Sequence, residues 1–218
     1  MTSPEDAKSA SRSVRNVAWS SLTEAEADAI RAIYEDAFPA TERRVLAEVV
    51  ATSDWLWVAK SDDTVTGFAT AALLPTANAA LLQYLAVVPR FQSAGIGSLL
   101  LACIERDLCD SGNALDGVYI EIEPLDGPDD GQQTERRYTF YLRWGAEPVI
   151  RMQEYFIADF SSASPSRVPM LLLWRSLSGA GQPGSDRLRD ALSDIYESEY
   201  SQYADPSFFN DILGRVRG

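Results

Sequence analysis

A strand-like run from Tyr84 to Val88 leads through Pro89 into a loop with two glycines, Gly95 and Gly97, at the start of a predicted helix. Glycine lets a ligand approach the backbone closely, and the first amides of a helix have no partner within that helix. Such amides, at the positive end of the helix dipole, favour an anion such as a pyrophosphate. A glycine pair at a helix start is also a plain packing device, so the spacing alone leaves both interpretations open.

Two carboxylates form a second candidate for chemistry. Glu121 and Glu123 alternate along the strand predicted from Val118 to Ile122, which places both on one face together with Tyr119. If that face looks into a cleft, either carboxylate could accept a proton, and the pair would attract a cationic amine. A charged stripe that faces solvent on a sheet has the same pattern, so this alternative stays open.

The glycine loop matches neither of the common nucleotide-binding motifs. Its spacing is Gln92-x-x-Gly95-x-Gly97, whereas a phosphate-binding loop requires GxxxxGK[ST] and a dinucleotide-binding turn requires GxGxxG. The loop instead resembles the acyl-CoA-binding motif of the GNAT superfamily of N-acetyltransferases, [RQ]xxGxG/A after a strand that ends in V-x-P. The resemblance implies that acetyl-CoA is the co-substrate and that the residues that bind it are Val87, Val88, Gln92, Ser93, Ala94, Gly95, Ile96, Gly97 and Ser98. In the family a backbone amide of the preceding strand, here near Val87, holds the thioester carbonyl.

A second stretch, Phe140 to Ala146, is similar to the FYxxxGF segment of the same family, with Ala146 in place of the last aromatic residue. The resemblance implies that Tyr141 protonates the leaving thiolate. A phenol with an ordinary pKa near 10 stays protonated at neutral pH and can deliver that proton. The alternative is that Tyr141 only packs under the sheet.

The remaining site residues follow from the alternation along the strand and, for the arginines, from the same resemblance. Glu121 and Glu123 become the candidate general bases, and Tyr119 on the same face becomes a candidate substrate contact. Arg43 and Arg44 lie in the region that lines the acceptor side in similar enzymes, where they would bind a carboxylate of the acceptor. An arginine pair on a helix is more often a solvated face.

Composition restricts the partners. The formal net charge of −13 and the sequence pI of about 4.4 repel nucleic acid and anionic lipid, and they attract a cationic amine. The chain has no histidine, and its two cysteines, Cys103 and Cys109, lack the spacing of a zinc site or a disulfide framework. We therefore expect no metal site. Without a membrane-length apolar run or a secretory signal, we also expect no membrane association and a cytoplasmic location.

The order of elements predicts a mixed α/β (α+β) fold. A capping box at Thr23 and Glu26 opens a helix, and an antiparallel meander precedes the glycine loop. Strands are also expected at Glu147 to Ile157 and at Val168 to Trp174. This order resembles the GNAT fold, a mostly antiparallel twisted sheet flanked by helices. We expect a flexible leader at 1–13, the acyltransferase domain at 14–178, and a linker with an appended C-terminal helical extension at 179–218.

The function expected from these features is transfer of an acetyl group from acetyl-CoA to a primary amine of a small molecule, by direct attack in a ternary complex. The alternatives are a longer acyl group and a non-catalytic module that binds acyl-CoA as a sensor. The helix expected at Ser185 to Tyr200 has an apolar stripe that could instead form a homodimer.

Overall fold

The computed structural model describes residues 11–110, 115–125, 131–161 and 166–217. Of the predicted leader, residues 1–13, the first ten lie outside the described residues. Arg12 and Ser13 already belong to the first strand, β1 (Arg12–Asn16), because they pair with the end of the next strand.

A central sheet organises the chain. Among the described residues its strands are β1, β2 (Trp55–Ser61), β3 (Thr64–Leu74), β4 (Ala79–Val87), β5 (Gly117–Ile122), β6 (Glu147–Pro148), β7 (Tyr155–Ala158) and β8 (Arg167–Ser176). The spatial order is β1-β2-β3-β4-β5-β8-β6, with β7 paired to β8. Of the described strand pairs only β4 and β5 run parallel. The predicted mixed, mostly antiparallel sheet is therefore confirmed.

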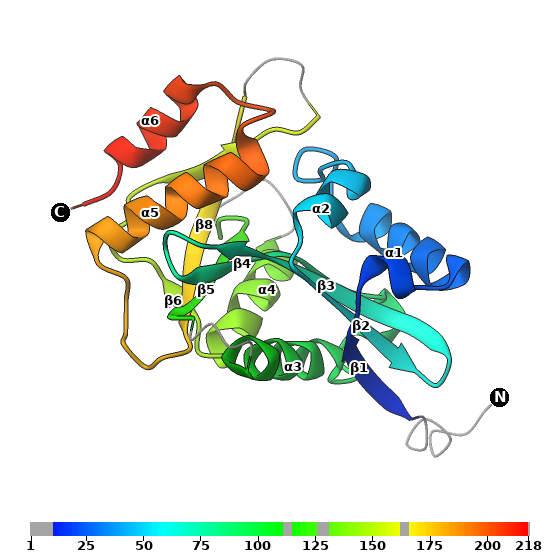
Figure 1. Cartoon of the computed structure of the whole chain (residues 1–218). Coiled ribbons are helices and arrows are strands. Elements are labelled where there is room, and N and C mark those ends of the chain that lie inside the picture. Colours follow the sequence, from blue (N-terminus) through cyan, green and yellow to red (C-terminus); the bar gives the residue numbers. More distant parts are fainter. Residues whose placement is uncertain (1–10, 111–114, 126–130, 162–165, 218) are drawn as a thin grey trace.

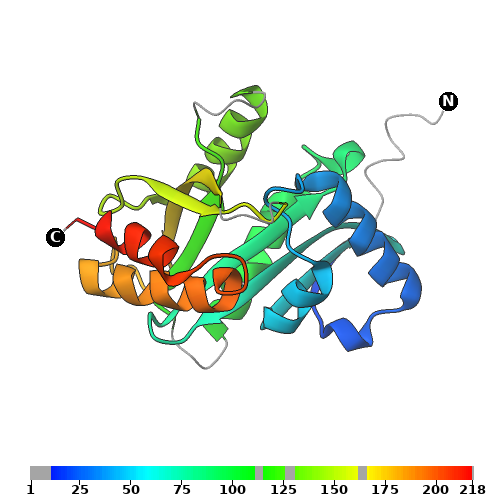
Figure 2. The same ribbon diagram turned by 90° about the horizontal axis from the view of Figure 1, so that it is seen from above.

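Helices cover both faces of this sheet (Figures 1 and 2). One face carries α1 (Glu24–Ala37) and α2 (Leu46–Thr52), with α5 (Ser185–Ile195) and α6 (Pro206–Gly214) farther along it. The other face carries α3 (Ile96–Asp110) and α4 (Gly131–Arg143). The capping box is formed as predicted, since the Thr23 hydroxyl accepts from the Glu26 amide and the Glu26 carboxylate accepts from the Thr23 amide.

Two predicted elements differ from the structure. The single strand expected from Glu147 to Ile157 is split into β6 and β7, because the chain turns between them. The helix expected from Ser185 to Tyr200 is α5 followed by one π-helical turn, Tyr196–Tyr200, and α6 was not predicted.

The apolar stripe of α5 lies in the core of the chain. Leu188, Ala191, Leu192 and Ile195 are at most 2% exposed and pack in one cluster with Leu74, Leu81, Tyr119 and Trp174 of the sheet. The stripe is therefore not available as the homodimer surface that the sequence left open. Apolar area buried in this way stabilises the chain by roughly 25 cal/mol per Å², so the segment after residue 184 contributes to the fold itself.

Candidate active site

The glycine loop forms a cradle of backbone amides. After β4 the chain makes a short 3₁₀ turn, Pro89–Phe91, and reaches α3 at Ile96. Within the described part of the chain, the amides of Gly95, Ile96, Gly97 and Ser98 donate to no protein acceptor. They are the unpaired first-turn donors that suit an anion.

Gly95 and Gly97 have different structural roles. Gly95 has φ +83°, a left-handed conformation, and a side chain there would meet nothing within 4 Å, so it would extend into open space. Gly97 has an ordinary φ, but a Cβ there would lie 3.1 Å from the Phe140 ring of α4. Gly95 therefore shapes the loop, whereas Gly97 lets α3 and α4 approach each other.

Three of the predicted coenzyme-binding residues have contacts within the chain, and one of them, Gln92, also lines the cleft. Gln92 donates from Nε2 to the Val87 carbonyl at 3.3 Å, and the Ala94 carbonyl accepts from Arg12 Nη1 at 2.6 Å. The Ile96 side chain is buried in the core, so only its amide can serve a ligand. The carbonyl contact from Arg12 ties the first strand to the loop, which the sequence did not indicate.

The two parallel strands separate at the site. Pairing of β4 with β5 ends at Leu82 and Ile120, although both strands continue. The register of β4 against β3 also shifts there, between the pairs that Leu82 and Tyr84 make, which leaves Gln83 as an extra residue in a bulge. The last residues of β4 consequently present one backbone edge that β5 does not cover.

The Val87 amide lies on this uncovered edge. Val88 donates its amide to the Thr66 carbonyl of β3 at 2.9 Å. Successive residues of a strand direct their amides to opposite edges, so the Val87 amide points away from β3. This is the geometry expected for a donor to a thioester carbonyl.

A cleft of about 1590 Å³ follows the separation of the strands. It is lined by the loop with Gly95 and Gly97, by Val87 and Val88, by Glu121 and Glu123, and by Tyr141 of α4. The structure therefore brings the predicted anion site and the predicted acid and base to one cavity.

Glu121 lies in the cleft between two tyrosines. It accepts a hydrogen bond from the Tyr155 hydroxyl, and both of its oxygens lie 2.8 Å from the Tyr200 hydroxyl. Burial raises the pKa of the Glu121 carboxyl to about 7, although the two tyrosine hydrogen bonds favour the charged form and lower it. A carboxylate with this pKa can take up and release a proton near neutral pH.

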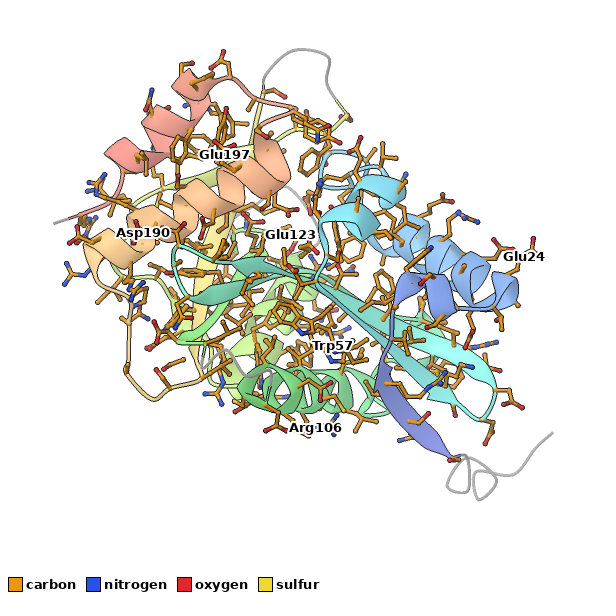
Figure 3. The ribbon with its side chains drawn as sticks, viewed as in Figure 1. Glu24, Trp57, Arg106, Glu123, Asp190 and Glu197 are labelled. Atoms are coloured by element: carbon orange, nitrogen blue, oxygen red, sulfur yellow. The ribbon has the colours of Figure 1, made fainter. Side chains whose placement is uncertain are left out.

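Glu123 has a different environment. Its carboxylate forms an ion pair with Arg137 of α4. In the view of Figure 3, Glu123 is labelled just below the C-terminal end of α5. Both carboxylates line the cleft, but only Glu121 is free of a cationic partner in direct contact. The two candidate bases that the sequence could not separate are thus distinguished by their partners.

Tyr141 lies on the opposite face of the sheet and is 6% exposed. Burial raises the pKa of its phenol to about 12, which nearby Arg137 partly offsets. The phenol stays protonated at neutral pH, as its predicted role requires, and it is a weaker acid than a free tyrosine.

The other predicted substrate contacts, Arg43, Arg44 and Tyr119, have partners within the chain, although Arg44 also lines the cleft. Arg44 is 3% exposed and forms an ion pair with Glu199, while Arg43 donates to the Glu35 and Phe38 carbonyls at the end of α1. Tyr119 is 1% exposed and packs against Trp174 in the core. These three residues hold the fold together, because their polar or aromatic groups already have partners inside the chain.

Sequence reasoning missed three residues of this site, Tyr155, Glu199 and Tyr200. Each reaches the cleft region from a segment remote from Glu121 in the sequence; Tyr200 is separated from Glu121 by 79 positions. No local pattern marks them, and Tyr200 carried only the helical periodicity of its segment.

The sequence model of the family described as acetyltransferase (GNAT) domain matches residues 52–145, from the end of α2 to the end of α4. This segment of the chain matches a GNAT acetyltransferase domain. The matched range contains the glycine loop, the separated strands, Glu121 and Tyr141. The predicted family and the predicted enzyme class, an acetyl-CoA-dependent acetyltransferase, are confirmed.

Solved structures of other proteins share the fold of this GNAT domain. A protein of the GNAT family from Bacteroides thetaiotaomicron is 17% identical with a TM-score of 0.61, covering 88% of this chain and 98% of its own. The ribosomal-protein-S18-alanine N-acetyltransferase of Escherichia coli is 16% identical with a TM-score of 0.55, covering 80% and 99%. A GNAT family acetyltransferase from Elizabethkingia anophelis with acetyl-CoA bound is 14% identical with a TM-score of 0.53, covering 76% and 97%. No curated protein sequence matches the chain.

Two further findings concern the described residues of the chain. Among the residues that the structure describes, no group of three or more His, Cys, Asp or Glu side chains is arranged to hold a metal ion. In the same part of the chain, no helix has both the length and the apolar character needed to cross a membrane.

Proposed function

We propose that the protein transfers an acetyl group from acetyl-CoA to a primary amine of a small cationic molecule. The observation that carries the proposal is one cleft lined both by the glycine loop with its unpaired amides and by Glu121, whose pKa is about 7. The fit to the coenzyme rests on the loop itself, where Gly95 leaves open space next to four free amides.

Acetyl-CoA supplies a thioester carbonyl and a thiol as the leaving group. The amides of Gly95 to Ser98 hold the pyrophosphate, and the Val87 amide donates to the thioester carbonyl oxygen and stabilises the charge that develops there. Exposed cations on α4, Arg136 and Arg143, also line the cleft and can balance phosphate charge.

Proton movements fall to two side chains. A cationic amine first loses one proton to solvent. Glu121 then accepts a second proton from the neutral amine as its nitrogen bonds to the acetyl carbon and the carbon–sulfur bond breaks. Tyr141 donates its proton to the sulfur; afterwards Glu121 releases its proton to solvent and Tyr141 regains one. The sum is neutral amine and thioester converted to amide and free thiol, with one further proton released when the acceptor starts as an ammonium ion.

The acceptor side favours a cation. Besides Glu121 and Glu199, the acidic side chains Asp36 and Glu42 line this part of the cleft, and the Arg44 charge is balanced by Glu199. The net charge of −13 adds to the attraction of an amine.

A second candidate acceptor is the N-terminal amine of a protein. The Escherichia coli structure with the same fold belongs to an enzyme named for a ribosomal protein. Both acceptors present a primary amine, and the chemistry at Glu121 is the same for either.

The test is release of free thiol from acetyl-CoA by the purified chain, with a panel of polyamines, amino acids, aminoglycosides and N-terminal peptides, followed by chromatography of the products. We expect release with a class of small cationic amines. Release with peptides alone would favour the second candidate. Thermal stabilisation by acetyl-CoA without release for any amine would identify a binding module and overturn the proposal.

Tyr141→Phe tests the acid. The substitution removes only the hydroxyl, so the core packing is preserved and turnover should fall about 100-fold. The affinity for acetyl-CoA, measured by calorimetry, should change little. Equal losses of turnover and affinity would contradict the role of Tyr141 as an acid.

A further inference from the structure

The C-terminal segment after residue 184 reaches the active site before it continues into α6. Its helix α5 lies across the sheet, and the π-helical turn that follows delivers Glu199 and Tyr200 to the cleft lining (Figure 1). Such turns occur mostly as short insertions in α-helices and frequently at functional sites. Not every residue of the turn faces the cleft, since the Glu197 side chain is exposed at the surface (Figure 3).

Glu199 anchors the turn at the point where the strands separate. The carboxylate is 4% exposed, and it forms an ion pair with Arg44 and accepts from Gln83 Nε2 at 2.9 Å. Gln83 is the extra residue of the β4 bulge. Breaking a buried pair of this kind costs more than its formation gains, so the turn is held firmly on the open edge of β4.

Tyr200 is held equally closely. Its side chain is 2% exposed, and its ring stacks on Phe160 with centroids 5.8 Å apart and planes at 18°. The hydroxyl is thereby directed to both Glu121 oxygens at 2.8 Å. Stacking on one side and a hydrogen bond at the tip leave the phenol little freedom.

We propose that the C-terminal segment completes the acceptor half of the active site, with Tyr200 as a positioning residue that holds the Glu121 carboxylate toward the amine. This inference rests on the proposed function, in which Glu121 is the base. The groups that face Glu121 from the elements packed around it are Tyr155 of β7, Tyr200 and Glu199 of the π-helical turn, and Arg44 before α2.

The experiment compares Tyr200→Phe with Tyr196→Phe in the full chain. Tyr196 lies in the same turn and donates to the Ala204 carbonyl at 2.9 Å, away from Glu121, so it is a matched control for the loss of one buried hydroxyl. The carbon-13 signal of the Glu121 carboxyl is titrated without any ligand and is assigned by its absence in Glu121→Gln.

Removal of the Tyr200 hydroxyl takes away a hydrogen bond that favours the charged carboxylate. We expect Tyr200→Phe to raise the pKa of Glu121 by about half a unit or more, and Tyr196→Phe to leave it unchanged. The acidic limb of the pH profile of kcat/KM should move up by the same amount in Tyr200→Phe alone.

An unchanged Glu121 titration in Tyr200→Phe overturns the proposal. A Tyr200→Phe protein that does not fold, beside a folded Tyr196→Phe protein, also overturns it, because the hydroxyl would then serve packing. A raised pKa in a protein that acetylates no amine supports the coupling to Tyr200 and instead counts against the proposed function.

Discussion

Replacing Glu121 with Gln is expected to lower kcat/KM for the amine by about 100-fold or more, the usual contribution of a general base. The amide keeps the shape of the side chain but cannot accept the proton of the amine. The affinity for acetyl-CoA should stay within about twofold, because the amides proposed to hold the pyrophosphate belong to the start of α3 and Glu121 belongs to β5. Steady-state kinetics with calorimetry of acetyl-CoA binding measure both quantities.

Glu123→Gln is the matched control for this change. Glu123 lies on the same face of β5 and lines the same cleft, but Arg137 already binds its carboxylate. We expect a loss of less than about tenfold. A loss in Glu123→Gln as large as that in Glu121→Gln would contradict the assignment of Glu121 as the base.

Glu121→Gln should also change the pH dependence of kcat/KM. Since the pKa of Glu121 is about 7, wild-type kcat/KM should rise as pH increases through this value, and the limb should vanish in Glu121→Gln. The folded pKa is raised above the ordinary value of 4.5, so the stability that protonated Glu121 contributes is complete below pH 4.5 and is lost as pH rises through 7. The free energy of unfolding of wild type should therefore fall relative to Glu121→Gln across this window, by at most about 3 kcal/mol.

The second large effect is expected at the glycine loop. Gly95→Val should raise the Kd for acetyl-CoA by at least about 100-fold, because a β-branched residue at φ +83° is strained and its side chain extends into the open space beside the free amides. Calorimetric titration with acetyl-CoA gives the Kd directly.

Gly179→Val is the control that distinguishes the effect of backbone strain from the effect of a blocked coenzyme site. Gly179 has a similar φ of +74°, and a Cβ there also meets nothing within 4 Å, but it lies in the linker before α5. The two variants should lose comparable stability, and only Gly95→Val should lose the coenzyme. Retention of wild-type affinity in Gly95→Val would place the pyrophosphate elsewhere.

Much of the coenzyme side of the site could be predicted from sequence. Gln92, Gly95 and Gly97 lie within six residues of one another, and their effect depends on local backbone geometry and on unpaired amides of one helix start. The same holds for the capping box at Thr23 and for the shared face of Glu121 and Glu123. Patterns of this kind are complete within a single element, which is why reasoning along the chain finds them.

Contacts between segments far apart in the sequence determine the environments of the residues proposed for the acceptor side. Arg44, a candidate for binding an acceptor carboxylate, forms an ion pair with Glu199, 155 residues away in the sequence. Glu121 acquired its environment from Tyr155 and Tyr200 in the same way.

By itself the sequence determined the mixed fold, the anion-binding loop and the two carboxylates as candidates. Only the tertiary structure decided which carboxylate lacks a cationic partner, that Gly97 lies against Phe140, and that Glu199 and Tyr200 line the cleft. The physical reason is that burial and pairing, which set the ionisation of a group, depend on chain segments that no local pattern relates to it.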